Sequence, residues 1–98
     1  MELRGKQKRH LRAIGVTLDP VLTIGKDGVS DHTIVQADGA LKTRELIKGR
    51  VLNTSPEGPA ETAAAVAGAT DAELVQVVGR NFLLFRQNPE APKIELPE

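Results

Sequence analysis

Ile24-Gly25-Lys26-Asp27-Gly28-Val29-Ser30 connects an apolar run at residues 21–24 to a stretch of helical periodicity that continues to about Thr43. The apolar run predicts a buried strand, and Ser30 is a favourable N-cap for the helix. The two glycines allow a tight turn that can approach a ligand closely, because neither carries a Cβ. The helix start offers N–H groups and the positive end of its dipole, and Lys26 adds a cation. This strand–loop–helix unit is therefore suited to contact a phosphate.

An amphipathic helix is predicted upstream, from Lys6 to about Val16. Its apolar stripe consists of Leu11, Ile14 and Leu18, and the opposite side of the helix carries Lys8, Arg9 and Arg12. Runs of charged residues usually lie on solvated surface, so the spacing alone is also consistent with a solvent-exposed face that binds no ligand. Five cations between residues 4 and 12 nevertheless repel one another by about 0.2–0.5 kcal/mol for each pair at i,i+4 spacing. A polyanion would relieve that repulsion.

The second strand is predicted at residues 45–52. Alternation places Lys48 and Arg50 on one face and Ile47 and Val51 on the other. Gly49 lies between the two basic residues, where we expect it to soften the strand or to introduce a bulge.

An Ala-rich helix at residues 60–69 follows two prolines, and residues 74–78 and 82–86 are predicted to form a hairpin across Gly79-Arg80-Asn81. The resulting order, α-β-α-β-α-β-β, predicts an α/β fold: one compact domain over residues 1–98 with a four-stranded mixed sheet. Residues 88–98 contain three prolines, and we expect an extended C-terminal tail.

Composition limits the class of protein. The chain has 98 residues, is 40% hydrophobic and contains no Cys. These values suit a single small domain without disulfides or thiolate metal sites. No apolar run is long enough to span a bilayer, and no secretory signal is evident. We therefore expect a cytoplasmic protein that does not associate with membranes.

A net charge of zero conceals an uneven distribution of charge. Residues 1–50 contain ten Lys and Arg against six acidic residues, and residues 51–98 contain three against seven. This pattern predicts a positive and a negative end, with the acidic half kept clear of a polyanionic ligand or facing a protein.

No catalytic or metal-binding constellation is present. His10 and His32 are isolated, and Ser30 has no His or acidic partner at motif spacing. We expect no enzyme activity, no metal and no cofactor.

The two aromatic residues, Phe82 and Phe85, fall in a strand predicted to be buried. Stacking of bases on aromatic side chains is therefore not expected, and contact with the backbone of a nucleic acid is favoured.

Several motifs together resemble one family. These motifs are residues 6–12 (KQKRHLR), 24–29 (IGKDGV), 44–48 (RELIK), 73–80 (ELVQVVGR) and 92–97 (PKIELP). Their order and spacing resemble the CRM domain, named for chloroplast RNA splicing and ribosome maturation, in its stand-alone bacterial YhbY-type form. The resemblance covers essentially the whole chain.

The resemblance implies a fold similar to the C-terminal domain of bacterial translation initiation factor three, with a GxxG loop that acts like the KH-domain loop on a nucleic-acid backbone. It also implies an RNA-binding protein that contacts ribosomal RNA in precursors of the large subunit and assists their assembly. We expect the protein to be a monomer. Carried onto this sequence, the RNA-binding positions are the loop and the basic helix, which we expect to lie beside it: Gly25, Lys26, Asp27, Gly28, Lys6, Lys8, Arg9 and Arg12. Lys48, Arg50 and Arg80 are secondary candidate contacts. The strand pattern favours a solvent-exposed face at Lys48 and Arg50 over a second contact, and the position of Arg80 at the hairpin tip is consistent with either role.

The sequence is consistent with three hypotheses for the function of this protein, each from a different functional class. RNA binding predicts an affinity that falls steeply with salt. A protein-interaction module, docking on a ribosomal or other protein through its segregated charges, predicts binding that survives nuclease. A nucleotide-binding enzyme is disfavoured, because the loop lacks the Gly-x-x-x-x-Gly-Lys-Ser/Thr pattern.

Overall fold

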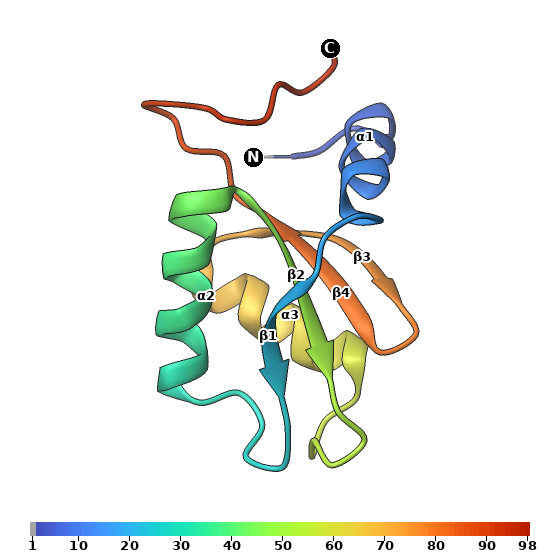
Figure 1. Ribbon diagram of the computed structural model, residues 1–98, viewed down its shortest axis with the longest axis vertical. Helices are drawn as coiled ribbons and strands as arrows, with labels where there is room; N and C mark the ends of the chain where they lie inside the picture. Colours follow the sequence, from blue (N-terminus) through green and yellow to red (C-terminus); the bar gives the residue numbers. More distant parts are fainter. Residues whose placement is uncertain (1) are drawn as a thin grey trace.

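The computed structural model describes residues 2–98, which form one mixed sheet with helices on both of its faces (Figure 1). The elements in chain order are α1 (Gly5–Gly15), β1 (Pro20–Ile24), α2 (Asp31–Arg44), β2 (Leu46–Val51), α3 (Pro59–Thr70), β3 (Glu73–Val78) and β4 (Asn81–Phe85). The predicted α-β-α-β-α-β-β order is confirmed. No helix in this part of the chain has the length and apolar character needed to cross a membrane.

The strand order β1-β2-β4-β3 explains how four short strands make one mixed sheet. β1 and β2 pair in parallel and are joined by α2, whereas β4 pairs antiparallel with both β2 and β3. The β3–β4 hairpin turns at Gly79, whose φ of 57° is the left-handed conformation that glycine adopts without strain. The fold class predicted from the sequence is therefore confirmed, including the parallel pair and the terminal hairpin.

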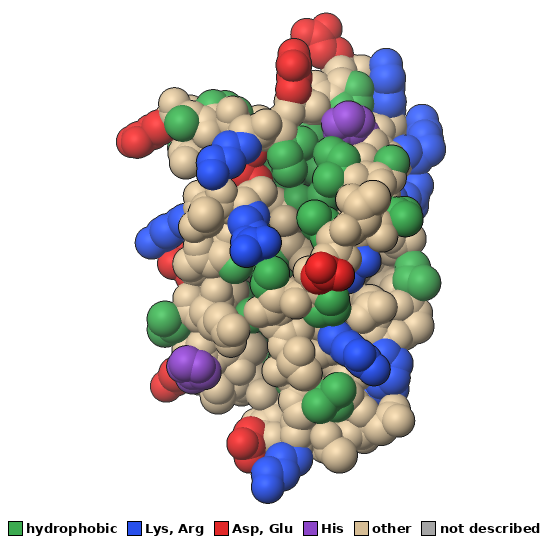
Figure 2. All heavy atoms as spheres, in the orientation of Figure 1, with side chains coloured by type: hydrophobic (Ala, Val, Ile, Leu, Met, Phe, Trp, Pro, Cys, Tyr) green, Lys and Arg blue, Asp and Glu red, His purple; other side chains and the backbone are tan. Residues whose placement is uncertain are grey.

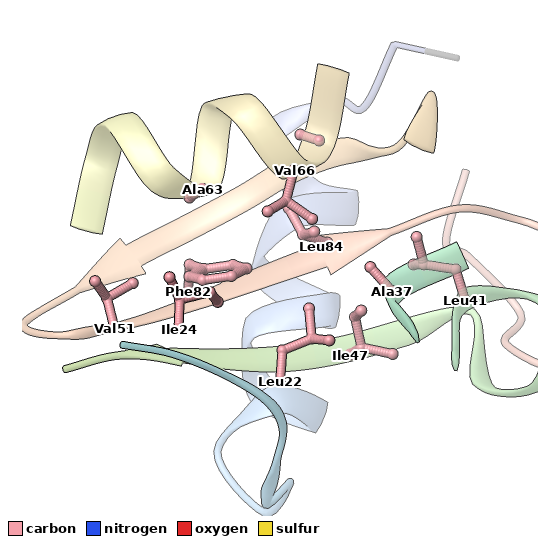
Figure 3. Packing of buried hydrophobic residues seen from close by; sticks show 11 residues of the cluster. Leu22, Ile24, Ala37, Leu41, Ile47, Val51, Ala63, Val66, Phe82 and Leu84 are labelled. Carbon is pink, nitrogen blue, oxygen red and sulfur yellow. The ribbon is translucent and has the colours of Figure 1, made fainter. Parts of the chain in front are cut away.

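One face of the sheet packs against α2 and α3. Figure 3 shows side chains from both helices meeting those of three strands around Phe82. The cluster includes Leu22, Ile47, Leu84 and Val66, each no more than 1% exposed. Burial of each such side chain contributes roughly 1.5–3 kcal/mol. This cluster is the main core and fixes the positions of β1 and α2, which flank the Gly25–Gly28 loop.

Gly49 serves the packing of this core. A Cβ at Gly49 would overlap the ring of Phe82, its direct cross-strand partner on β4. The β2–β4 register runs without interruption through Gly49. The register irregularities lie instead in β1, between Pro20 and Leu22, and in β3, between Leu74 and Gln76. The expectation of a bulge in β2 was therefore wrong. Glycine is needed here because an aromatic ring occupies the space of its side chain.

The other face of the sheet is covered in part by α1. Leu11 packs with Leu46, Leu83 and Phe85 in a second buried cluster. The C-terminal end of α1 approaches the sheet so closely that a Cβ at Gly15 would overlap Leu83. Ile14 and Leu18 also contact this cluster, as their predicted stripe requires.

Residues 88–98 form no helix or strand, but they are anchored to the domain. Ile94 and Leu96 pack against the α1 cluster, and the side chain of Gln7 donates a 3.1 Å hydrogen bond to the carbonyl of Pro97. In Figure 1 this segment crosses one end of the molecule beside α1.

Glu45 provides the second anchor. It was expected to begin the second strand, but it forms the C-cap of α2 with φ of 65°. Its side chain is fully buried at 0% exposure, and its carboxylate accepts hydrogen bonds from the backbone N–H groups of Asn88 (2.6 Å), Lys93 (2.7 Å) and Ile94 (2.7 Å). Burial by itself raises the pKa of Glu45, but these three hydrogen bonds outweigh it, so the pKa lies below its usual value.

Candidate nucleic-acid interface

The Gly25–Gly28 loop is a closed four-residue turn. The N–H of Gly28 donates a 2.9 Å hydrogen bond to the carbonyl of Gly25, which leaves Lys26 and Asp27 exposed at the two central positions. Ser30 caps α2 as predicted, because its Oγ accepts a 3.2 Å hydrogen bond from the N–H of Thr33. The strand, the turn and the helix start thus have the predicted local geometry.

The two glycines of the turn have different roles. Gly28 is buried, has φ of 66°, and leaves room for Pro56, whose Cγ would lie 3.1 Å from an added Cβ. Gly25 does not have a positive φ, and an added Cβ would make an ordinary 3.5 Å contact with Leu52. The fold therefore favours glycine at position 28, where a side chain would be strained and would crowd Pro56. At position 25 glycine leaves the backbone accessible without being needed for the turn.

The charge around the loop is mixed. Lys26 is the one cation between the two glycines, whereas Asp27 follows it and Asp31 occupies the first position of α2. The carboxylate of Glu57 lies on the other side of the loop, 3.6 Å from where a Cβ of Gly28 would be. The loop and its immediate neighbours thus carry three carboxylates and one ammonium group. The loop therefore carries no excess of positive charge of its own.

Four of the predicted RNA-binding cations lie along α1. The predicted RNA-binding residues of α1 form no side-chain hydrogen bond or ion pair within residues 2–98; they are Lys6, Lys8, Arg9 and Arg12. Figure 2 shows Lys and Arg side chains along one edge of the molecule, from α1 past the strands. A cation without an acidic partner can bind a phosphate without first breaking an existing ion pair.

The basic surface continues onto the part of the sheet that α1 leaves open. Strand register places Thr23, Arg50, Asn81 and Val78 in one row across all four strands, and all four residues are exposed. Lys48 lies in the neighbouring row, nearer α1, and is half-buried. In the described chain neither Lys48 nor Arg50 has a side-chain partner. We call Lys6, Lys8, Arg9, Arg12, Lys48 and Arg50 the basic face.

Arg80 has a structural role at the hairpin. Its guanidinium donates hydrogen bonds to the carbonyls of Val51 (2.7 Å) and Leu52 (3.0 Å). These bonds hold the end of β2 and the start of the loop that packs beside the Gly25–Gly28 turn. Arg80 is therefore largely occupied within the protein, unlike the cations of the basic face.

The two predicted contact regions are not adjacent. Figure 1 shows α1 and the Gly25–Gly28 loop toward opposite ends of the molecule, which is 39 Å in its longest dimension. The expectation of the basic helix beside the loop was wrong, because β1 runs from one to the other. Lys48 and Arg50 fill the interval: Lys48 lies near Arg12, and Arg50 pairs with Thr23, one residue before the last of β1.

The acidic half of the sequence does not form a separate end of the molecule. Because the tail packs on α1, Glu95 borders a shallow hollow that is also lined by His10. The prediction of a positive and a negative end was therefore wrong. The tail brings carboxylates to the same end as the basic helix.

Sequence reasoning also missed an ion pair that joins three elements. Arg86 donates a 2.8 Å hydrogen bond to the carboxylate of Asp38 on α2 and a 2.7 Å hydrogen bond to the carbonyl of Thr70 at the end of α3. The hydrogen bond from Arg86 to Asp38, together with Lys42 at 3.2 Å, holds the pKa of Asp38 below its usual value. No local pattern signals a pair that lies 48 residues apart in sequence.

Comparison with known proteins shows which family this α/β domain belongs to. The model of the CRS1/YhbY (CRM) domain matches residues 3–86, so the chain belongs to that family. The chain is 41% identical over 95 residues to "Probable RNA-binding protein YqeI" of Bacillus subtilis, covering 97% of this chain and 99% of YqeI. It is 34% identical to a Haemophilus influenzae protein named "RNA-binding protein", covering 97% and 95% of the two chains.

A solved structure agrees with the fold. The solution structure of the hypothetical protein SAV1595 from Staphylococcus aureus matches with a TM-score of 0.81 and 43% identity, over 98% of this chain and all of that one. The resemblance drawn from the sequence motifs is therefore confirmed. The names of the relatives describe binding to RNA and no catalytic activity.

Proposed function

We propose that this protein binds structured RNA through its phosphate backbone, and that the RNA is ribosomal RNA in a precursor of the large ribosomal subunit. The observation that carries RNA binding is the basic face, whose cations have no acidic partner in the described structure. A polyanion is the ligand that such a surface attracts. The names of the relatives support RNA as that polyanion. The assignment to large-subunit assembly rests on the family resemblance.

The proposed contacts form one long surface. The turn residues Gly25, Lys26, Asp27 and Gly28 meet phosphates at one end, and α1 meets them at the other. Lys48 and Arg50 bridge the two. Phe82 and Phe85 are buried, at 1% and 0% exposure, so neither offers a platform for stacked bases. Contacts with phosphates position an RNA without reading its sequence. We infer a monomeric cytoplasmic binding protein, not an enzyme, that recognises the shape of its RNA.

The test is binding to a large-subunit ribosomal RNA fragment across a salt series. We expect a log–log slope of about −2 to −4, which corresponds to roughly three to five neutralised phosphates. Lys48→Ala/Arg50→Ala should reduce the slope by about two, because each phosphate contact contributes about one. Gly25→Asp should weaken binding through the turn while keeping the fold. Lys42→Ala is the matched control, because Lys42 already pairs with Asp38.

Circular dichroism would verify that each variant is folded. Binding that does not depend on salt, or that the control weakens as much as the face variant, would contradict the proposal. Co-sedimentation with a large-subunit precursor tests the assembly role. Loss of co-sedimentation after nuclease supports RNA contact, whereas its survival would favour the protein-interaction alternative.

A further inference from the structure

A hollow of about 230 Å³ lies on the sheet between the C-terminal end of α1 and the open strands. Its wall on the helix side includes Arg12 and Val16, and its wall on the sheet side includes Lys48, Gln76, Val78 and Asn81. It therefore sits within the basic face, between α1 and the row of exposed residues that contains Arg50.

The hollow exists because α1 ends above the middle of the sheet. Gly15 contacts Leu83 at that point, and the chain then turns away toward β1. The pair Val78 and Asn81 is left uncovered at the hairpin end. Val16 is 80% exposed and Val78 is 58% exposed, and they are two of the three large apolar residues exposed in the described chain. Exposed apolar residues that border one concave site indicate a ligand more often than scattered ones do.

The side chains of the hollow fall into three chemical kinds. Arg12 and Lys48 are cations, Gln76 and Asn81 are amides, and the valines are apolar. None of the four polar side chains has a partner within residues 2–98. A phosphate suits the cations, a planar ring suits the apolar rim, and the donor and acceptor groups of a base edge suit the amides. A nucleotide combines all three features.

We infer that this hollow receives one unpaired nucleotide of the bound RNA. The phosphate lies at Arg12 and Lys48, and the base lies against Val16 and Val78 within reach of Gln76 and Asn81. A base inside a duplex cannot enter, since its edge is paired and its faces are stacked, whereas a bulged base can leave the stack. This inference rests on the proposed function and adds to it a preference for RNA with an unpaired nucleotide.

The experiment compares two RNAs: a fully paired hairpin stem, and the same stem with one bulged 2-aminopurine nucleotide. The wild-type protein should bind the bulged stem about five- to tenfold more tightly, the effect of one or two net hydrogen bonds. The fluorescence of 2-aminopurine should change on binding. Gln76→Ala/Asn81→Ala should abolish both the preference and the fluorescence change. Its affinity for the paired stem should change by less than about twofold, because no charge is lost.

Gln36→Ala is the matched control, because it removes an amide from α2, on the opposite face of the sheet. This control should keep the preference. Equal, salt-dependent affinity of the wild type for both stems would overturn the inference and leave the proposed function intact. An equal loss of affinity for both stems in Gln76→Ala/Asn81→Ala would also overturn it. Absence of binding to either stem would contradict the proposed function itself.

Discussion

At the scale of single residues, Glu45 joins the end of α2 to the C-terminal tail. Replacing it with Gln keeps the size but places an amide NH2 where the carboxylate accepts from backbone N–H groups. We expect Glu45→Gln to lower the free energy of unfolding by about 1–3 kcal/mol at pH 7, because Gln keeps only one of the two acceptor oxygens and at least one buried N–H group loses its acceptor. Urea unfolding measures this, with exposed Glu90→Gln as the control.

The same carboxylate predicts a pH dependence. The pKa of Glu45 is lower in the folded protein than its ordinary value of 4.5. The carboxylate therefore stabilises the fold fully above about pH 4.5, and this stabilisation is lost as the pH falls through the folded pKa. The difference in stability between wild type and Glu45→Gln should shrink from pH 5 to pH 3. A constant difference across that range would show that the charge of Glu45 contributes nothing.

The two glycines of the turn give a second prediction at this scale. Gly28→Ala should lower the free energy of unfolding by about 1–2 kcal/mol, since its φ of 66° is unfavourable for a residue with a Cβ. Gly25→Ala should change it by less than about 1 kcal/mol. Thermal unfolding of the two variants tests the contrast. Equal destabilisation would mean that both glycines are needed for the fold.

At the scale of elements, the tail and α1 stabilise each other. Ile94 and Leu96 pack on the cluster beneath α1, and Lys93 and Ile94 donate to Glu45. Truncation before Pro92 should therefore raise hydrogen exchange of the α1 amides by about 10- to 100-fold, as local opening of that helix becomes easier. The amides of α3, in the other core, should change less. A uniform increase across the chain would indicate global destabilisation instead.

At the scale of the whole molecule, the tail carboxylates should oppose RNA binding. Glu95 and Glu98 lie on a segment packed beside α1 (Figure 1). Their replacement by Gln should tighten RNA binding about two- to threefold at low salt, an effect that screening removes at high salt. Glu61→Gln/Asp71→Asn, at α3 on the other face, is the matched control. Unchanged affinity in the tail variant would place the RNA away from this end.

The sequence alone determined the elements, their order and the turn between Gly25 and Gly28, because periodicity, caps and glycines act over a few neighbouring residues. It also identified the four cations of α1, since an amphipathic helix must expose its charged side, and strand alternation placed Lys48 and Arg50 together on one face. The tertiary structure decided the contacts between distant residues. Glu45 binds N–H groups 43 to 49 residues away, and the ring of Phe82 occupies the space above Gly49. It also decided that α1 lies far from the turn and that a hollow opens beside Arg12. Such features depend on how elements pack, and no local spacing of residues encodes that packing.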